Sequence, residues 1–468
     1  MRPQGSIATD AMPTTSAPTI RDIVYAPSVP ELIRQMRRKG QLGFFMDAWR
    51  DYGDLPHLKL GGREMFLVIH PDHVRRVTVS HADNYDKLET YDIVRELLLG
   101  DGLVASRGEL WRRQRRLMAP FFTPRAIEQY LPVFVADTEA LIDRWTRLAS
   151  QGQPIELGDE MMLVTAAVIL HTMFSTESSD DMLEIKAAVE TMIRYVASGQ
   201  QNPIQLPRWL PTPANRRYFK ARELVHHYIA ALLAQRRSLP QDQWPDDLLT
   251  KLMLARDEQT GEAMSDALLR DESITIFFAG HETTARTLNF LFYALAQHPE
   301  VEQRMVAEIE PVLGGRTPTV EDLKRLPYTL QVIKETLRLY PAAPLYARDV
   351  VADDQMDGVH LPGGTRVLPF PYATHRHPGF WPDPERFDPE RWTAEAEAAR
   401  HPYAFHPFAA GKRICLGNNF SLFETHVITA MLVPRFHLQL KPGHQPQVVM
   451  EGTIASKNGM PMTIEQRR

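Results

Sequence analysis

The chain has 468 residues, of which 44% are hydrophobic and 24% are charged, and its formal net charge is −5. A chain of this length and apolar content can bury a large core, which excludes an intrinsically disordered protein. The small net charge argues against a nucleic-acid-binding protein, so any surface for a charged partner must be local.

The N-terminal residues 1–20 are rich in Ser, Thr, Pro and Ala and lack a long apolar run, which predicts a flexible leader and no secretory signal. No segment has the roughly 20 consecutive apolar residues of a membrane span. We therefore expect a soluble, cytoplasmic protein without a membrane anchor. No later break has the composition of a linker, so residues 21–468 are expected to form one domain.

The remaining pattern predicts a mainly α fold with small β-sheets. Two short strands are expected within 55–69, around Gly61-Gly62, and a helix begins near Pro71. Apolar spacing is mostly helical from about 108 to 340, including 130–150, 180–198 and 214–237. After Pro341 the chain is rich in Pro and Gly, with strand candidates at 347–351 and 365–369. One domain of this size suggests a core organised around a cofactor.

One helix is expected to cross the whole domain. It begins after Ser265, a plausible N-cap, and continues to Gln297, which at the usual rise gives roughly 45 Å. Its centre, residues 279–284, reads Ala-Gly-His-Glu-Thr-Thr, and glycine and threonine weaken a helix. The Thr283 hydroxyl can bond the carbonyl of Ala279, which would make a small polar notch.

Glu282 and Thr283 place an acid beside an alcohol at this notch. Such a pair can hold water and pass protons in a dry cavity, although a buried helix that tolerates threonines is the alternative. His281-Glu282 also begins like the helical zinc motif His-Glu-x-x-His, but Ala285 stands where the second histidine is required, so zinc hydrolase chemistry is improbable.

Cys415 is the only cysteine, so an internal disulfide and a multi-cysteine metal site are excluded. Its remaining roles are nucleophile, single axial ligand or inert core residue. Gly411 and Gly417 flank it, Phe408 offers an aromatic wall, and Arg413 is a cation that favours the thiolate.

The segment 408–417 resembles the cysteine-ligand loop of the cytochrome P450 family, with its pattern Phe-x-x-Gly-x-Arg-x-Cys-x-Gly. The resemblance implies that haem b is buried between the long helix and this loop, with Cys415 as the iron ligand and Phe408 and Gly417 beside the cofactor. A thiolate ligand pushes electron density onto iron and favours O–O cleavage.

Residues 279–284 resemble the pattern of the same family that lines the oxygen pocket, Ala/Gly-Gly-x-Asp/Glu-Thr-Thr/Ser. The resemblance implies that Ala279 and Gly280 lie over the iron and that Thr283 stabilises bound oxygen. Glu282 would then relay protons from solvent.

Glu335 and Arg338 resemble the Glu-x-x-Arg helix of the family, in which the pair meets an arginine from a later loop. That loop is matched by residues 387–392, which supply Arg391. Arg386 is a nearby alternative, but spacing from Phe387 favours Arg391. The resemblance implies a structural role, holding the loop of Cys415.

Haem carries two carboxylates, and burying them requires fixed cations, preferably arginines. Trp111 and Arg115 match the family's Trp-x-x-x-Arg element, Arg348 matches its strand arginine, and Arg413 comes from the cysteine loop. The neighbouring Arg112, Arg113 and Arg116 would project elsewhere and form a basic patch for an acidic electron donor, or an ordinary solvated helix face.

The residues expected to touch substrate are apolar and match the substrate positions of the family: Phe277, Phe278, Ala342, Ala343, Leu345 and Ile454. They indicate a lipophilic substrate such as a fatty acid, terpenoid, steroid or polyketide, without choosing among them. The expected activity is a haem-thiolate monooxygenase that uses O2 to hydroxylate or epoxidise this substrate.

Electrons are expected from separate partners, a ferredoxin or similar donor with its reductase, because no flavin or iron-sulfur domain is recognised in the chain. Two alternatives remain at this level. One is a peroxygenase of the same fold that uses hydrogen peroxide, and the other is a non-catalytic haem protein. The acid and alcohol at 282 and 283 favour the monooxygenase.

Overall fold

The computed structural model describes residues 24–25, 27–60, 63–175, 179–201 and 207–467, and the leader predicted for residues 1–20 lies outside them. The helices are α1 (Val29–Tyr52), α2 (Pro71–Arg75), α3 (Asp92–Val94), α4 (Gly108–Met118), α5 (Pro124–Glu128), α6 (Leu131–Ser150), α7 (Leu157–Phe174), α8 (Ser179–Gln201), α9 (Pro213–Ser238), α10 (Leu248–Leu254), α11 (Asp266–Gln297), α12 (Pro299–Leu313), α13 (Val320–Lys324), α14 (Pro327–Leu339), α15 (Pro371–Thr374), α16 (Ala394–Ala399) and α17 (Asn418–Leu432). The strands are β1 (Val24–Tyr25), β2 (His57–Leu60), β3 (Arg63–Val68), β4 (Tyr85–Asp86), β5 (Ile155–Glu156), β6 (Arg348–Val350), β7 (Asp354–Met356), β8 (Val359–Leu361), β9 (Arg366–Pro369), β10 (Phe436–Leu440), β11 (Val448–Glu451), β12 (Thr453–Ser456) and β13 (Pro461–Gln466).

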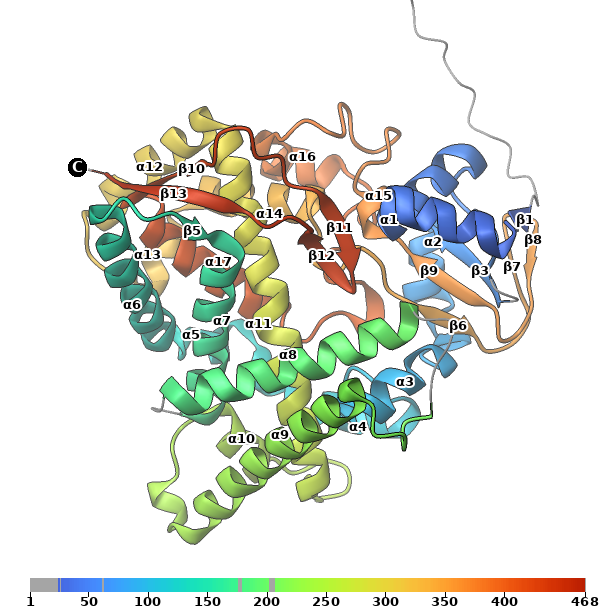
Figure 1. Ribbon diagram of the computed structural model, residues 1–468, viewed down its shortest axis with the longest axis horizontal. Coiled ribbons are helices and arrows are strands. Elements are labelled where there is room, and N and C mark those ends of the chain that lie inside the picture. The colour runs from blue at the N-terminus through green and yellow to red at the C-terminus, as the bar shows by residue number, and fades with distance from the viewer. Residues whose placement is uncertain (1–23, 26, 61–62, 176–178, 202–206, 468) are drawn as a thin grey trace, which may run out of the picture.

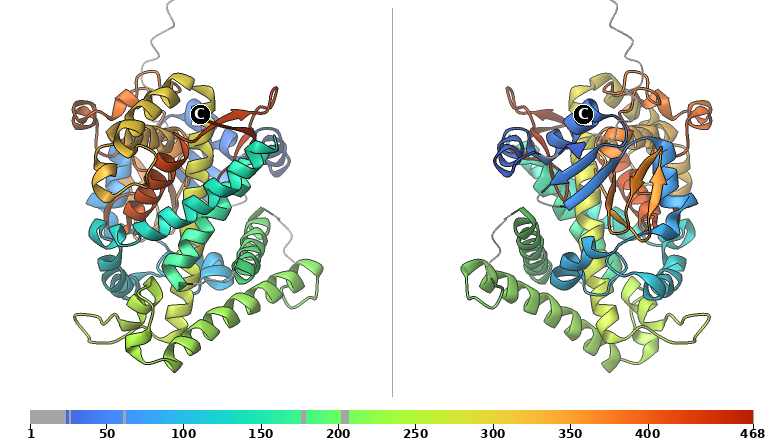
Figure 2. Two further views of the ribbon diagram at one scale, coloured as in Figure 1. Left: turned by 90° about the vertical axis from the view of Figure 1, so that its left-hand side faces the viewer. Right: turned by 90° about the vertical axis from the view of Figure 1, so that its right-hand side faces the viewer.

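The long helix α11 runs through the middle of the molecule (Figures 1 and 2). It begins where the sequence predicted, because the Ser265 side chain accepts the N–H of Leu268 at 3.2 Å and caps the first turn. It ends at Gln297, before Pro299 starts α12. α7, α9, α14 and α17 pack against it, and α8 packs against α9. The helices expected at 130–150, 180–198 and 214–237 are confirmed as α6, α8 and α9.

The strands form small sheets beside this helical mass. The largest has the order β1-β2-β3-β9-β6-β4 and lies next to α1 (Figure 1). The predicted early hairpin is its antiparallel β2–β3 pair, and the strand candidates near 350 and 367 are its β6 and β9. The sheet β10-β13-β5 and the hairpins β11-β12 and β7-β8 were not predicted. The predicted mainly α fold with small sheets is confirmed.

Among the described residues, α7 alone is long and apolar enough to cross a membrane by length and composition. It packs against α6 and α11, and 67% of its apolar window is buried inside the protein. Its apolar sequence is therefore accounted for by the core.

Candidate active site

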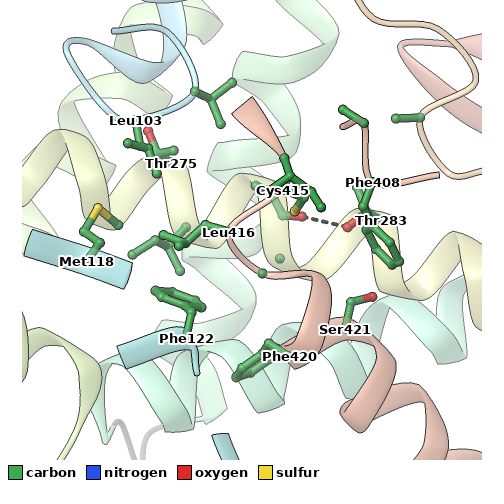
Figure 3. A pocket seen from close by; sticks show the side chains of 18 of the residues that line it. Leu103, Met118, Phe122, Thr275, Thr283, Phe408, Cys415, Leu416, Phe420 and Ser421 are labelled. Atoms are coloured by element: carbon green, nitrogen blue, oxygen red, sulfur yellow. Dashed lines mark hydrogen bonds between the residues drawn. The ribbon is translucent and has the colours of Figure 1, made fainter. Parts of the chain in front are cut away.

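A cavity of about 330 Å³ lies between α11, α4 and the loop that carries Cys415 (Figure 3). Its walls come from segments that are far apart in sequence: Lys87, Tyr91, Leu103, Val104, Trp111, Arg115, Met118, Phe121, Phe122, Tyr130, Ile169, Thr172, Met173, Leu248, Thr275, Ile276, Ala279, Gly280, Thr283, Thr284, Thr287, Leu337, Ala342, Ala343, Tyr346, Arg348, the segment 407–409, the segment 413–417, Phe420 and Ser421. Ten of the predicted cofactor and oxygen-pocket residues thus meet at one place, whereas Glu282 is absent from the lining.

The α11 residues that face the cavity follow the helical period, in the steps 275–276, 279–280, 283–284 and 287. Phe277 and Phe278 lie between these steps and are not in the lining, which departs from the prediction. Phe277 is buried on another face, where its ring stacks on His281 with centroids 4.7 Å apart. Helix phase is the physical reason, since adjacent residues are turned about 100° from each other.

The polar notch of α11 forms as predicted, but the helix stays continuous through it. Thr283 Oγ1 donates to the carbonyl of Ala279 at 2.7 Å, and both residues line the cavity. Glu282 points elsewhere, where its Oε1 accepts from Thr453 Oγ1 at 2.7 Å and lies 3.4 Å from Arg286 Nη2. The alcohol therefore faces the cavity directly, while the neighbouring acid is held against β12 by partners of its own.

The cysteine loop presents one sulfur to the cavity. The Cys415 N–H donates to the Phe408 carbonyl at 2.9 Å, which closes the loop behind the side chain. Gly411 lies so close to the Thr78 carbonyl that a side chain there would overlap it, so the loop can dock only with glycine at this position. The Cys415 sulfur is reachable from the cavity although it is deep in the protein.

Burial raises the pKa of the Cys415 thiol, because a thiolate is poorly solvated there. The Gly417 N–H, which bonds the sulfur, and the cations Arg115 and Lys87 lower the pKa and oppose this effect. The loop is therefore arranged to support a thiolate once a positive ligand replaces the lost solvent.

Four cations gather on one wall of the cavity: Lys87, Arg115, Arg348 and Arg413. Arg115 donates to the Ile414 carbonyl at 2.8 Å, and Arg413 lies over the Trp111 ring, with its guanidinium carbon 3.9 Å from the ring centroid. The arginines and Trp111 were predicted from the sequence, whereas Lys87 was not. Only the fold brings Lys87 here, where its Nζ donates to the Val104 carbonyl at 2.6 Å.

This wall carries more positive charge than its neighbours neutralise. Arg413 has an acidic partner in Asp86, at 2.7 Å. Burial, together with the charges of Arg348 and Arg413, brings the pKa of Lys87 well below its usual range. A buried ligand with two carboxylates would restore the balance, and the Cys415 sulfur is available for its metal. These residues therefore fit haem with its two propionates.

The predicted scaffold pair is fully buried and forms as expected. Glu335 and Arg338 have no exposed side-chain surface and share two hydrogen bonds of 2.8 Å each. Arg391 Nε lies 3.6 Å from Glu335 Oε1, whereas the alternative, Arg386, extends towards solvent. The structure thus brings together the residues that were predicted to meet.

A buried histidine connects this scaffold to the cysteine loop. His375 Nδ1 lies 3.2 Å from the Arg338 carbonyl, and its Nε2 accepts the backbone N–H of His406 at 2.9 Å. Burial keeps the pKa of His375 well below its usual range, so the ring is neutral and donates from Nδ1. His406 precedes Pro407 at the cavity wall, which makes this link the route by which α14 positions the loop.

The remaining predicted substrate residues divide into two groups. Ala342 and Ala343 line the cavity. Leu345 packs instead against the smaller core cluster between α1 and the large sheet, and Tyr346 takes the place at the wall. Ile454 is fully buried and reaches the site through its backbone, whose N–H donates to the Ala342 carbonyl at 3.0 Å.

The basic run on α4 is largely neutralised by acids of the same protein. Arg112 lies 3.1 Å from Glu109, Arg113 lies 3.1 Å from Glu262, and Arg116 lies 3.2 Å from Asp257. Arg112 is the most exposed of the arginines, with 55% of its side-chain surface accessible. Arg113 and Arg116 fasten the segment that precedes α11.

The chain is similar to known proteins over almost its whole length. The family model described as Cytochrome P450 matches residues 28–463. A cyclooctat-9-en-7-ol 5-monooxygenase of Streptomyces melanosporofaciens is 36% identical over 416 residues, covering 86% of this chain and 88% of that protein. A pentalenene oxygenase of Streptomyces avermitilis is 32% identical over 412 residues, covering 88% and 90%.

Among solved structures, the haem domain of cytochrome P450DA superposes with a TM-score of 0.87 and 27% sequence identity. The match covers 95% of this chain and 97% of that domain. The shared fold, the cavity with its single thiol and the family match agree. The chain therefore belongs to the cytochrome P450 family and is a haem-thiolate monooxygenase that binds haem b.

Proposed function

We propose that the protein inserts one oxygen atom from O2 into a neutral, lipophilic terpenoid, by hydroxylation or epoxidation. The observation that carries the substrate class is the distribution of charge in the cavity. The charged side chains of its described lining are Lys87, Arg115, Arg348 and Arg413, all on the wall that fits the cofactor carboxylates.

The rest of the cavity is lined mainly by apolar side chains such as Ile169, Met173, Leu248 and Ile276. Burying a carboxylate without a partner is strongly unfavourable, so a fatty acid fits this wall less well than a neutral hydrocarbon skeleton. Two relatives are named for cyclooctat-9-en-7-ol and pentalenene, which supports the same choice.

When bound, haem with the Cys415 thiolate as its ligand supplies the activation of O2. We propose that Lys87, Arg115, Arg348 and Arg413 hold its carboxylates. Thr283 Oγ1 gives its own hydrogen to the Ala279 carbonyl, which leaves its lone pairs free to accept a hydrogen bond from a protonated oxygen or a water in the cavity. Glu282 would supply protons from the solvent side, by exchanging its bond to Thr453 for one to water.

Replacing Thr283 by alanine should leave haem bound but uncouple electron use from product formation. Because a positioned proton-transfer group contributes roughly 10²-fold or more, we expect product per electron pair to fall by about tenfold or more, with peroxide rising in its place. The measurement is product and peroxide per NADPH consumed. Thr138→Ala is the matched control, since Thr138 is a buried threonine that bonds the carbonyl four residues earlier, away from the cavity. Full coupling in Thr283→Ala would contradict the role given to Thr283.

The proposed reaction is tested with a panel of neutral cyclic terpenes and fatty acids of similar size. Spectral shifts on binding rank the compounds, and turnover under ¹⁸O2 with a surrogate ferredoxin and reductase should add one labelled oxygen atom to a terpene. Turnover with hydrogen peroxide alone at the same rate would identify a peroxygenase. Preferential oxidation of fatty acids would overturn the substrate class.

We infer that electrons come from a separate acidic donor such as a ferredoxin, which docks near the cysteine loop. Of the three arginines in the predicted basic patch, Arg113 and Arg116 pair with acids of the segment before α11. Arg112 is the most exposed of the three and is therefore the residue we expect a donor to contact. The charges of Lys412 and Arg112 both lower the pKa of Asp83, so the two cations lie on the same face of the protein.

Arg112→Glu should slow reduction by the surrogate ferredoxin severalfold at low salt, because charge at the rim of an interface mainly changes the association rate. The rate of haem reduction is measured by stopped flow at several salt concentrations. Arg37→Glu makes the same charge change on the exposed face of α1 and is the control. Equal rates for the two variants would rule out docking at Arg112.

We also propose that the protein is soluble and cytoplasmic. The support is the burial of α7 within the core and the similarity to bacterial members of the family. Fractionation of the source cells would test it.

A further inference from the structure

The segment 100–107, here called the cover loop, forms part of the cavity wall. Its residues Leu103 and Val104 line the cavity, and Leu103 is drawn at the same wall as Thr275 in Figure 3. One side of the loop is fixed at the cation wall, where Lys87 donates to the Val104 carbonyl at 2.6 Å and Arg413 donates to the Ser106 carbonyl at 2.9 Å. The position of this part of the wall therefore also depends on what holds the other side of the loop.

Two consecutive acids of α11 hold that other side. Asp271 accepts the backbone N–H of Asp101 at 2.9 Å, and Glu272 accepts the backbone N–H of Leu103 at 3.0 Å. These contacts join segments about 170 residues apart in sequence. Each is a hydrogen bond from the loop backbone to a carboxyl group of α11.

Glycines permit this close approach. A side chain at Gly100 would overlap the Asp271 carboxylate, and one at Gly102 would overlap Thr275 Oγ1 and crowd the Asp271 carbonyl. The loop backbone therefore lies directly on α11, and any residue larger than glycine at these positions would push it away.

Glu272 is an unusual anchor, because it is fully buried and its second oxygen, Oε1, has no hydrogen-bond partner in the part of the chain that the structure describes. A scaffold carboxyl normally has both oxygens satisfied, as in Glu335, whose Oε1 accepts from Arg338 and the Asp388 N–H and whose Oε2 accepts from Arg338 and the Trp392 ring N–H. The Leu103 N–H is thus the hydrogen bond that orients the Glu272 carboxyl group, and breaking it would free the loop at residue 103 on the α11 side.

We propose that Glu272, supported by Asp271, is a latch that holds the cover loop closed on α11 and so controls how readily lipophilic ligands enter and leave the cavity. Glu272 acts through Leu103 and is a positioning residue. Its relevance to substrate rests on the proposed function, whereas the latch itself concerns only the chain.

The latch should loosen as the pH rises. Burial, and the charge of Asp271, raise the pKa of Glu272 to about 8, while the Leu103 N–H opposes the shift. The charged or titratable groups that face this region are Asp271, Arg270, Asp101, Arg95 and His226, together with Lys87 and Arg413, which hold the other side of the loop. Burial brings the pKa of Lys87 well below its usual range, so Lys87 favours closure as the pH rises, which is opposite in sign to Glu272. Asp271 pairs with Arg270 and Asp101 pairs with Arg95, and burial lowers the pKa of His226 to about 4.

The direction of this pH dependence follows from the protonation of Glu272 in the closed and the open loop. In the open loop the carboxyl group is in water and has an ordinary pKa, so opening at neutral pH releases a proton. Closure is therefore most favoured below the ordinary pKa, and it weakens by up to about tenfold per pH unit until about pH 8.

The test is hydrogen exchange at the Leu103 amide in the holoprotein, with each rate corrected for the intrinsic effect of pH. Glu272→Ala should lower protection about tenfold or more, since it removes the acceptor of this bond. Glu272→Gln keeps a neutral acceptor of the same shape, so it should retain protection and abolish its decline with pH. The matched control is Glu160→Ala, because Glu160 is also buried but pairs with Arg144, away from the loop.

Binding of 4-phenylimidazole, followed by its Soret shift, gives the functional readout. Glu272→Ala should raise both the association and the dissociation rate of 4-phenylimidazole. Gly102→Ala should do the same, because the added methyl group would overlap Thr275 and push the loop away from α11 while Glu272 is unchanged. Unchanged protection in Glu272→Ala, or a pH slope that persists in Glu272→Gln, would overturn the latch. Neither hydrogen exchange nor ligand binding requires turnover. If the protein does not oxidise terpenoids, both measurements can therefore still support or contradict the latch.

Discussion

Cys415→Ala is expected to abolish monooxygenase activity while leaving the fold intact. The Cys415 sulfur is the sole thiol of the chain and the group that the loop presents to the cavity. The backbone bond from residue 415 to Phe408 and the docking of Gly411 on Thr78 do not depend on this side chain, so the loop should keep its shape. Without a thiolate, the iron loses the electron donation that favours O–O cleavage.

The measurement is turnover of the best terpene from the panel, together with haem content and far-UV circular dichroism. We expect product at background level and an unchanged circular dichroism spectrum. Activity in Cys415→Ala within tenfold of the parent would show that the sulfur is not the ligand used in the reaction.

Arg338→Ala is expected to have the largest effect on stability. The Arg338 guanidinium is fully buried and bonds both oxygens of Glu335. It also donates to the carbonyls of His375, Pro384 and Arg386, at 2.9, 2.6 and 2.9 Å. Removing it takes the bidentate cation from the buried Glu335 carboxylate and a donor from each of these carbonyls, and breaking a buried pair in this way destabilises a protein by about 3–5 kcal/mol.

The free energy of unfolding is measured by urea titration of the holoprotein, with haem release followed at the Soret band. Arg144→Ala is the control, because Arg144 binds Glu160 with the same bidentate geometry but keeps 48% of its side chain exposed. Glu160 is buried but keeps the Trp145 ring N–H as a partner, and Arg144 is half-exposed, so losing this pair should cost less than losing the fully buried one. Equal midpoints for Arg338→Ala and Arg144→Ala would contradict the scaffold role.

Several parts of the site could be predicted from sequence because their signals are local. The bounds of α11 follow from the Ser265 cap and the break before Pro299, and the notch follows from the spacing of Thr283 and Ala279. Cys415 could be identified because it is the only cysteine of the chain and because the residues around it match the family's ligand loop. The partner of the Glu335 and Arg338 pair, Arg391, needed the family pattern as well as spacing.

The parts that were missed depend on side-chain direction or on contacts between distant segments. No pattern in the sequence around Lys87 indicates that it is a buried cation at the cavity. Phe277 points away from the cavity because of its position around the axis of α11, which the sequence alone does not fix. The Glu272 contact with Leu103 spans 169 residues, so no periodicity in either segment predicts it.

The charge of the α4 face could not be predicted for a similar reason. Arg113 and Arg116 meet Glu262 and Asp257, which come from a segment about 140 residues later. A run of arginines in a sequence therefore gives an upper limit to the charge of a surface, because acids from elsewhere in the fold can neutralise it.

The most direct test of the central claim, that Cys415 is the thiolate ligand of a haem held in this cavity, is the carbon-monoxide difference spectrum of the reduced protein. We predict the red-shifted Soret band of a thiolate-ligated haem in the parent protein, and its replacement in Cys415→Ser by the shorter-wavelength band of a haem without a thiolate ligand. A parent protein without the red-shifted band, or a Cys415→Ser variant that retains it, would contradict the claim.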